Sequence, residues 1–370
     1  MQRIEAMATS RNKLQNFRKQ IPNTPVMFDL DAKRQRITRI HNRGNFLDQG
    51  EEVTASVLTT FAQLPADAPA NRLGVARWLM TADNPLTARV TVNRIWARIF
   101  GIGLVETEED FGTQGRPPSH PALLDWLAVD FREQGWSLKK LIKTIVMSQT
   151  YQQSSVVTEQ ALSVDPRNRL LSRGPRFRLS AEMVRDQALA VSNLLINKIG
   201  GPSVMPPQPP GIWKSTYSGE KWKNAEGDDR YRRGLYTYLK RTSPYPAMTT
   251  FDAGSGEICQ IRRIRTNTPL QALITLNDVV YLEAAGKLAQ RMEKSGDNLK
   301  AKVAAGFQMV LIRDADDSEI SRLIKLYESL EDELSDGKDL LNSANLTSGD
   351  PRLVVIASVL LNLDETLMKP

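Results

Sequence analysis

Residues 84–146 decide the fold class of this chain: NPLTARVTVNRIWARIFGIGLVETEEDFGTQGRPPSHPALLDWLAVDFREQGWSLKKLIKTIV. Apolar side chains recur in its first part at positions i, i+3, i+4 and i+7, which places them on one helix face: Val92, Ile95, Trp96 and Ile99. Gly101 predicts the end of that helix. Ser119 and Ser137 each precede another apolar periodic run, so we expect them to cap two further helices that pack as an antiparallel pair.

Helical periodicity continues toward the C-terminus. Ser180 is expected to cap a helix that runs to Gly200, and the segment 316–318 to cap another. Residues 200–213, GGPSVMPPQPPGIW, are too rich in proline for a helix, since proline lacks the N–H donor. Aromatic enrichment predicts short strands around 231–239. Further helices are predicted over 269–276, 278–294, 297–312, 318–335 and 350–367.

The N-terminal part of the chain has a different character. Residues 1–20 predict a short polar helix or tail, and residues 25–53 are the best candidate for a small β element. Residues 62–71, AQLPADAPAN, have the composition of a linker. We therefore expect a tail and β element over 1–62, then a helical domain over 71–370 with an irregular insertion at about 200–268. The expected fold class is mainly α.

The composition narrows the possible chemistry. A single Cys excludes an internal disulfide and every multi-cysteine metal or haem site, and two His leave at most a sparse mixed-ligand metal site. We expect no metal and no cofactor in this chain. No apolar run reaches the ~18 residues of a membrane-spanning helix. The N-terminus also lacks the apolar core of a secretory signal.

The net charge of +7 is unevenly distributed. Residues 1–160 carry +4, residues 161–270 carry +9 and residues 271–370 carry −6. A basic middle segment favours an anionic partner. Nucleic acid is not the expected partner, because no nucleic-acid-binding motif occurs and the acidic last third would repel a phosphate backbone.

An arginine-rich loop in this basic segment is the leading candidate site. Guanidinium groups bind carboxylates, sulfates and phosphates through a fork of donors, while aromatic rings stack on sugars. The pattern predicts a site for an anionic saccharide. In the alternative interpretation, the arginines brace an irregular segment by pairing with its acids and carbonyl groups. The candidate anion contacts are Arg262, Arg263, Arg265 and Asn267, with Trp213 and Tyr236 as stacking platforms.

Two weaker candidates remain. Asp110, His120 and Asp125 flank a Gly/Pro turn, and a carboxylate paired with His can act as a general base. A hydrolase of this kind requires the three side chains to converge in one cleft, whereas helix capping explains His120 equally well. Cys259 is the only thiol, and we expect it to be a buried spectator.

Six segments, in order along the chain, resemble the domain of unknown function called the planctomycete surface domain. The resemblance extends from about Asn42 to the C-terminal residues. One departure lies before Cys259, where the family typically has Ser-Arg-Glu and this chain has Ser-Gly-Glu at 255–257. The segments are 84–131, 135–155, 165–186, 200–213, 232–253 and 261–278.

The resemblance implies a larger context. Members of the family usually carry a secretion signal, a cytochrome c-like haem domain and a companion domain before this one. The resemblance therefore implies an extracytoplasmic or cell-envelope location, and haem only on an upstream domain that this chain lacks. It also implies a second function, a scaffold that docks the cytochrome c-like and companion domains. We accordingly expect this chain to be a fragment or a shortened paralogue.

Overall fold

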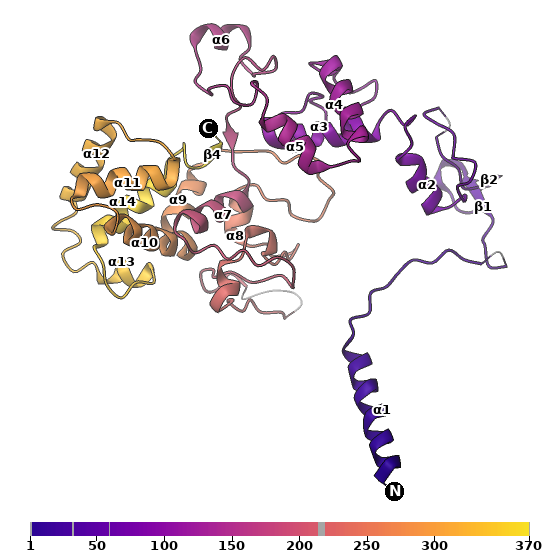
Figure 1. The fold of residues 1–370 in the computed structure, drawn as a ribbon, viewed down its shortest axis with the longest axis horizontal. Coiled ribbons are helices and arrows are strands. Elements are labelled where there is room, and N and C mark those ends of the chain that lie inside the picture. Colours follow the sequence, from indigo (N-terminus) through magenta and orange to yellow (C-terminus); the bar gives the residue numbers. More distant parts are fainter. Residues whose placement is uncertain (1, 32, 59, 214–218, 370) are drawn as a thin grey trace. The chain divides into compact units, whose positions relative to one another are not determined.

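The computed structural model describes residues 2–31, 33–58, 60–213 and 219–369 (Figure 1). It is mainly helical and contains two short antiparallel strand pairs, which confirms the expected fold class. The chain divides into two compact units, Met1–Thr87 and Ala88–Pro370. We describe each unit by itself.

The first unit buries very little of its surface. Strand β1 pairs antiparallel with β2, and the cross-strand pair Arg39 and Glu52 forms an ion pair at 3.5 Å. The expected small β element is confirmed, but the segment 26–30 (VMFDL) forms no strand. Among the residues of this unit whose burial is described, three are buried: Gly74, Trp78 and Asn84. The elements are α1 (Gln2–Gln20), β1 (Thr38–His41), the 3-10 turn η1 (Asn42–Gly44), β2 (Gln49–Val53) and α2 (Arg72–Leu79).

The second unit begins with the helices that the opening stretch predicts, and they enclose the first of its two apolar clusters. The rings of Trp96 and Phe100 stack with their centroids 4.1 Å apart. Ser137 caps α5 as expected, by accepting a hydrogen bond from the N–H of Lys140. Ser119 does not cap α4: His120 is the N-cap residue, because Pro121 takes the first helical position. These helices are α3 (Thr87–Phe100), α4 (Pro121–Glu133) and α5 (Leu138–Val146). The short helix α6 (Glu159–Val164) follows them, and it was not predicted.

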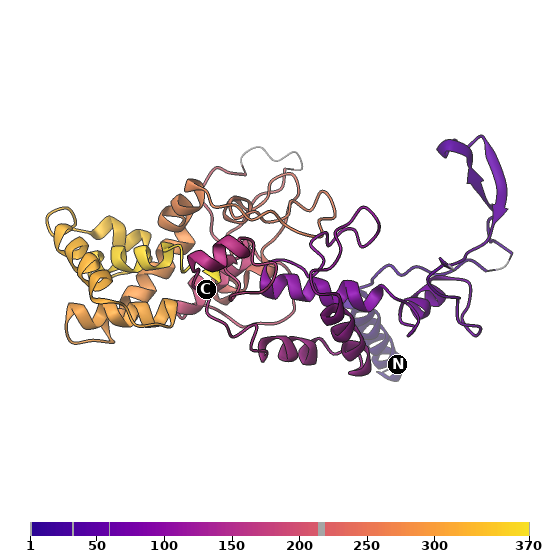
Figure 2. The same ribbon diagram turned by 90° about the horizontal axis from the view of Figure 1, so that it is seen from above.

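The C-terminal helices form one group of elements (Figures 1 and 2). They enclose the second apolar cluster. Helix α10 packs most extensively against α14 and lies at the centre of the group. Ser180 caps α7 by accepting a hydrogen bond from the N–H of Met183. The five helices predicted after residue 268 are confirmed, with ends shifted by up to six residues: α9 (Pro269–Asn277), α10 (Val279–Glu293), α11 (Leu299–Leu311), α12 (Asp317–Ser329) and α14 (Pro351–Asn362). Helix α7 (Ala181–Val191) is shorter than predicted. The short helices α8 (Pro246–Thr250) and α13 (Lys338–Ser343) were not predicted.

Two predictions for the middle segment are wrong. Helix α7 ends at Val191 instead of running to Gly200, because the hydroxyl of Ser192 donates to the carbonyl of Ala188 and Asn193 adopts φ 60°. The expected strands at 231–239 are the 3-10 turns η2 (Gly227–Tyr231) and η3 (Gly234–Tyr236), with only isolated bridges to 196 and 204. Part of the predicted insertion, residues 214–218, lies outside the described residues.

The last described residues return to the middle of the chain. Strand β4 (Met368–Lys369), labelled beside the C-terminus in Figure 1, pairs antiparallel with β3 (Phe177–Arg178). The ammonium of Lys369 donates to the carbonyl of Ile99 at 3.1 Å and lies 4.1 Å from the ring centroid of Tyr151. Burial lowers the pKa of Lys369 to about 8. This contact joins the C-terminal strand to the first apolar cluster.

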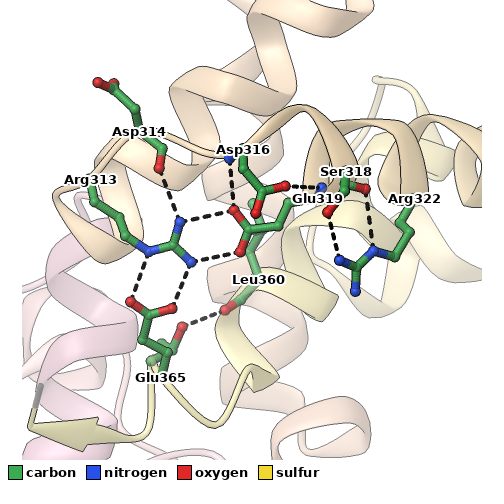
Figure 3. A network of polar contacts seen from close by, with 9 residues as sticks. Arg313, Asp314, Asp316, Ser318, Glu319, Arg322, Leu360 and Glu365 are labelled. Carbon is green, nitrogen blue, oxygen red and sulfur yellow. Dashed lines mark hydrogen bonds and ion pairs between the residues drawn. The ribbon is translucent and has the colours of Figure 1, made fainter. Parts of the chain in front are cut away.

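A network around Arg313 fixes α12 to the turn after α14 (Figure 3). Its guanidinium forms paired hydrogen bonds with both carboxylate oxygens of Glu319 and with both of Glu365, at 2.7–2.9 Å. Asp316 and Glu319 form a capping box at the start of α12, which confirms the predicted cap. Hydrogen bonds from Arg313 lower the pKa of both glutamates.

Candidate functional site

The arginine segment 261–265 lies between the two apolar clusters of the second unit. Toward the first cluster, Arg262 Nη2 pairs with Glu109 Oε1 at 2.9 Å. Arg265 Nη1 donates to the carbonyl of Gly101 at 3.3 Å, and its guanidinium lies 4.4 Å from the ring centroid of Phe177. The side chains thus bind protein groups from three separate segments.

Arg263 points to the other cluster. Its Nη1 donates to both carboxylate oxygens of Glu182, on α7, at 2.8 and 2.9 Å. Burial raises the pKa of Glu182, but hydrogen bonds from Arg263, the backbone N–H and Ser180, together with the charge of Arg263, outweigh this effect, so the net pKa is lowered. Asn267 is exposed, and its side chain forms no hydrogen bond within the part of the chain that the structure describes.

The two aromatic candidates lie among protein neighbours. Trp213 is only 7% exposed and its ring packs edge-to-face on Trp222, with centroids 5.1 Å apart. The hydroxyl of Tyr236 accepts a hydrogen bond from the N–H of Gly200 at 2.7 Å. The guanidinium of Arg232 covers one face of the Tyr236 ring, 3.6 Å from its centroid.

Asp110, His120 and Asp125 have separate partners. Asp110 Oδ1 accepts a hydrogen bond from the N–H of Gly112 at 2.6 Å, and His120 Nδ1 lies 3.0 Å from the hydroxyl of its neighbour Ser119. Asp125 is exposed and pairs with Arg89 Nε at 2.6 Å. Across the described ranges, no hydrogen bond or ion pair joins any two of these three side chains.

The acidic loop before Asp110 contains a site residue that sequence reasoning missed. Glu106 pairs with Arg116 and Arg167, and Glu109 pairs with Arg262. Glu108, between them, is only 9% exposed, and its Oε2 is buried with no hydrogen-bond partner among the residues that the structure describes.

Several arginines surround Glu108 without pairing with it. Burial raises the pKa of its carboxyl, and the charges of Arg98, Arg262 and Arg94 oppose this effect without cancelling it. Arg94 and Arg98 are exposed and four residues apart on α3, where two like charges repel each other. The repulsive spacing of Arg94 and Arg98 is the one feature of the sequence that could have indicated the arginines around Glu108.

Other site chemistry is sparse in the described residues. No group of three or more His, Cys, Asp or Glu side chains is placed to hold a metal ion within those ranges. No described helix has the length and apolar character needed to cross a membrane. Cys259 is exposed, so the expectation of a buried thiol is wrong.

Comparison with known proteins identifies a family and no activity. No curated protein and no solved structure matches this chain. The family model described as PSD1, protein of unknown function (DUF1553), matches residues 71–327, which is well over half of the chain. The matched stretch begins just before α2 and contains the acidic loop and the arginine segment. The chain therefore belongs to the PSD1 family of proteins of unknown function (DUF1553).

Proposed function

We propose that this chain is an interaction scaffold that docks other protein domains, and that the arginine segment is part of its internal structure. One observation carries the proposal: Arg262, Arg263 and Arg265 all bind groups of this chain, on both sides of the segment. Arginines that hold two apolar clusters together have fewer donors left for a ligand. The scaffold interpretation therefore fits the contacts better than a saccharide site does.

Exposed apolar side chains support docking. Ile264 is 81% exposed, and Leu270 and Leu273, three residues apart on α9, are each more than half exposed. In the first unit, Phe28 is 84% exposed within a segment that forms no strand. Large apolar side chains lose free energy when they leave water, so such surfaces favour a protein partner. The proposed partners are the cytochrome c-like and companion domains, in the cell envelope.

The test uses a double variant, Ile264→Ser with Leu273→Ser, and purified cytochrome c-like and companion domains. Because both side chains are exposed, we expect an unchanged melting temperature and at least about tenfold weaker association with one of the domains. Val156→Ser, which changes another exposed apolar residue, is the matched control. Undiminished association of the double variant, or no association of the unaltered chain with either domain, would contradict the proposal.

An anionic saccharide is the second candidate, because the side chain of Arg262 remains 53% exposed despite its ion pair. A sulfated glycan that binds there should raise the melting temperature of the protein, and added salt should abolish the rise. The triple variant Arg262→Ala, Arg263→Ala and Arg265→Ala should lose the rise completely. An equal rise in the triple variant excludes this site.

A further inference from the structure

The carboxyl of Glu108 is buried, and its Oε2 has no hydrogen-bond partner among the described residues. Buried polar atoms in proteins almost always have a hydrogen-bond partner, because leaving one unpaired is costly. Its neighbours Glu106, Glu109 and Asp110 all have partners, whereas in the described part of the chain Glu108 Oε2 has none. Glu108 Oε2 can therefore still accept a hydrogen bond from a ligand.

Arginine side chains from two distant parts of the chain lie around this carboxyl. Arg94 and Arg98 come from α3, and Arg262 and Arg265 come from the arginine segment, and all four act electrostatically on or with Glu108. None of them forms an ion pair with it within the described residues. Arg94 has no hydrogen-bond or ion-pair partner anywhere in those ranges. Arg98 Nη2 donates to the carbonyl of Ile261 at 3.2 Å, and Arg262 Nη1 donates to the carbonyl of Glu106 at 3.5 Å. These contacts bring guanidinium groups to the loop of Glu108 without a direct pair to its carboxyl.

The arrangement selects a ligand by its hydrogen-bonding groups. Guanidinium forks require an oxyanion with several acceptor oxygens, and a carboxylate oxygen requires a donor. A phosphate monoester has its second pKa at about 6, so at pH 7 roughly one molecule in ten carries an O–H group beside its charged oxygens, and a carboxylate acceptor favours that form. Sulfate offers only acceptors. A phosphate group can therefore satisfy both Arg94 and Glu108, whereas sulfate leaves Glu108 without a donor.

We propose that Glu108, Arg94, Arg98 and Arg262 form a binding site for a phosphate group, in which Glu108 Oε2 accepts the hydrogen bond from the P–O–H. One proton is shared by the carboxyl and the phosphate. Burial favours this sharing because it raises the pKa of Glu108, while Arg94, Arg98 and Arg262 oppose the rise and Glu109 adds to it. The proposal does not depend on the docking function.

The test is a calorimetric titration of the full chain with inorganic phosphate, methyl phosphate and sulfate at about pH 7. We expect saturable binding of phosphate and at least about tenfold weaker binding of sulfate. Tighter binding of methyl phosphate assigns the site to a phosphate monoester, and tighter binding of inorganic phosphate assigns it to the free anion. Equal affinity for phosphate and sulfate, or no saturable binding of either phosphate, would overturn the proposal.

Variants separate the two parts of the site. Arg94→Ala should lower the affinity for phosphate about tenfold, because this substitution removes a charged hydrogen-bond donor. Glu108→Gln should reduce the preference for phosphate over sulfate to about one, because an amide can serve as acceptor or donor. Arg322→Ala on α12, an exposed arginine outside the site, should change neither property. Thermal unfolding verifies that each variant folds. An unaltered preference in Glu108→Gln contradicts the assigned role of the carboxyl.

Discussion

Two arginine groups in the second unit differ in how completely their hydrogen bonds are formed. Arg313 uses both sides of its guanidinium fork on Glu319 and Glu365, and Figure 3 shows the two carboxylates on adjacent sides of it. Around Glu108, by contrast, the arginines approach the carboxyl without pairing with it. The first group joins α12 to the turn after α14, and the second leaves Glu108 Oε2 without a hydrogen-bond partner in the described part of the chain.

This difference in pairing indicates that the Arg313 group contributes to folding stability and that the groups around Glu108 are suited to binding a ligand. Paired, bidentate guanidinium–carboxylate contacts add to folding stability because every donor and acceptor is used. A buried carboxyl oxygen that nearby guanidinium groups leave without a partner among the described residues adds nothing of this kind, and it makes the folded state less stable than an apolar or neutral residue there would. The first arrangement is expected to respond to mutation as structure, and the second as a ligand site.

The largest loss of folding stability is expected when the hydrogen bonds of Arg313 are removed. Arg313→Ala removes the hydrogen bonds to both carboxylates and leaves two like charges close together. Because the guanidinium is about a third exposed, solvent screens part of the loss, and we expect a destabilisation of about 2 kcal/mol. Chemical denaturation measures this value. Arg322→Ala, which removes only contacts with Ser318, is the control and should cost less than about 0.5 kcal/mol.

The same group predicts an acid dependence of stability. Hydrogen bonds from Arg313 lower the pKa of Glu319 and Glu365 from 4.5 in the folded state. A lowered folded-state pKa means that the stabilisation is complete above 4.5 and disappears as the pH falls through the folded-state values. The difference in unfolding free energy between the unaltered chain and Arg313→Ala should therefore shrink below pH 4.5. A difference that stays constant down to about pH 2 would contradict this origin.

A smaller effect is expected in the arginine segment. Arg263→Ala removes an ion pair with Glu182 that is only partly buried, so we expect a loss of at most about 1 kcal/mol and a fall in melting temperature of about 2–4 °C. Differential scanning calorimetry measures the shift. Arg241→Ala, at an exposed position without an ion pair in the described residues, is the matched control and should leave the melting temperature unchanged.

Local sequence signals predicted the helices well, because caps and apolar periodicity act over a few residues. Ser137, Ser180 and Asp316 cap their helices as expected. The strands at 231–239 failed for a tertiary reason. A Cβ at Gly234 would lie 2.9 Å from the Cα of Glu182, so this segment packs against α7 as a 3-10 turn despite its aromatic residues.

The candidate site was less predictable, because its character depends on which distant segments meet. Arginine-rich composition indicated Arg262 and its neighbours, but it gave no information about their acidic partners. The arginine segment reaches the loop of Glu108, but its Arg262 pairs with Glu109, and Glu108 Oε2 has no hydrogen-bond partner among the described residues. No local pattern encodes that approach across more than a hundred residues. Trp213 likewise reads as a stacking platform until its packing against Trp222 is known.

The smallest effect on stability is expected at Glu108, where a substitution should stabilise the folded state and not destabilise it. Because burial raises the pKa of Glu108, the ionised carboxylate is less favourable in the folded state than in the unfolded state. Stability from this residue is therefore highest below its unfolded-state pKa and falls as the pH rises through its folded-state pKa. Glu108→Gln should unfold at equal or slightly higher denaturant concentration at neutral pH, with a gain below about 1 kcal/mol, and the gain should vanish in acid. A destabilised Glu108→Gln at neutral pH would mean that the carboxylate has a stabilising partner, and it would remove the contrast with Arg313.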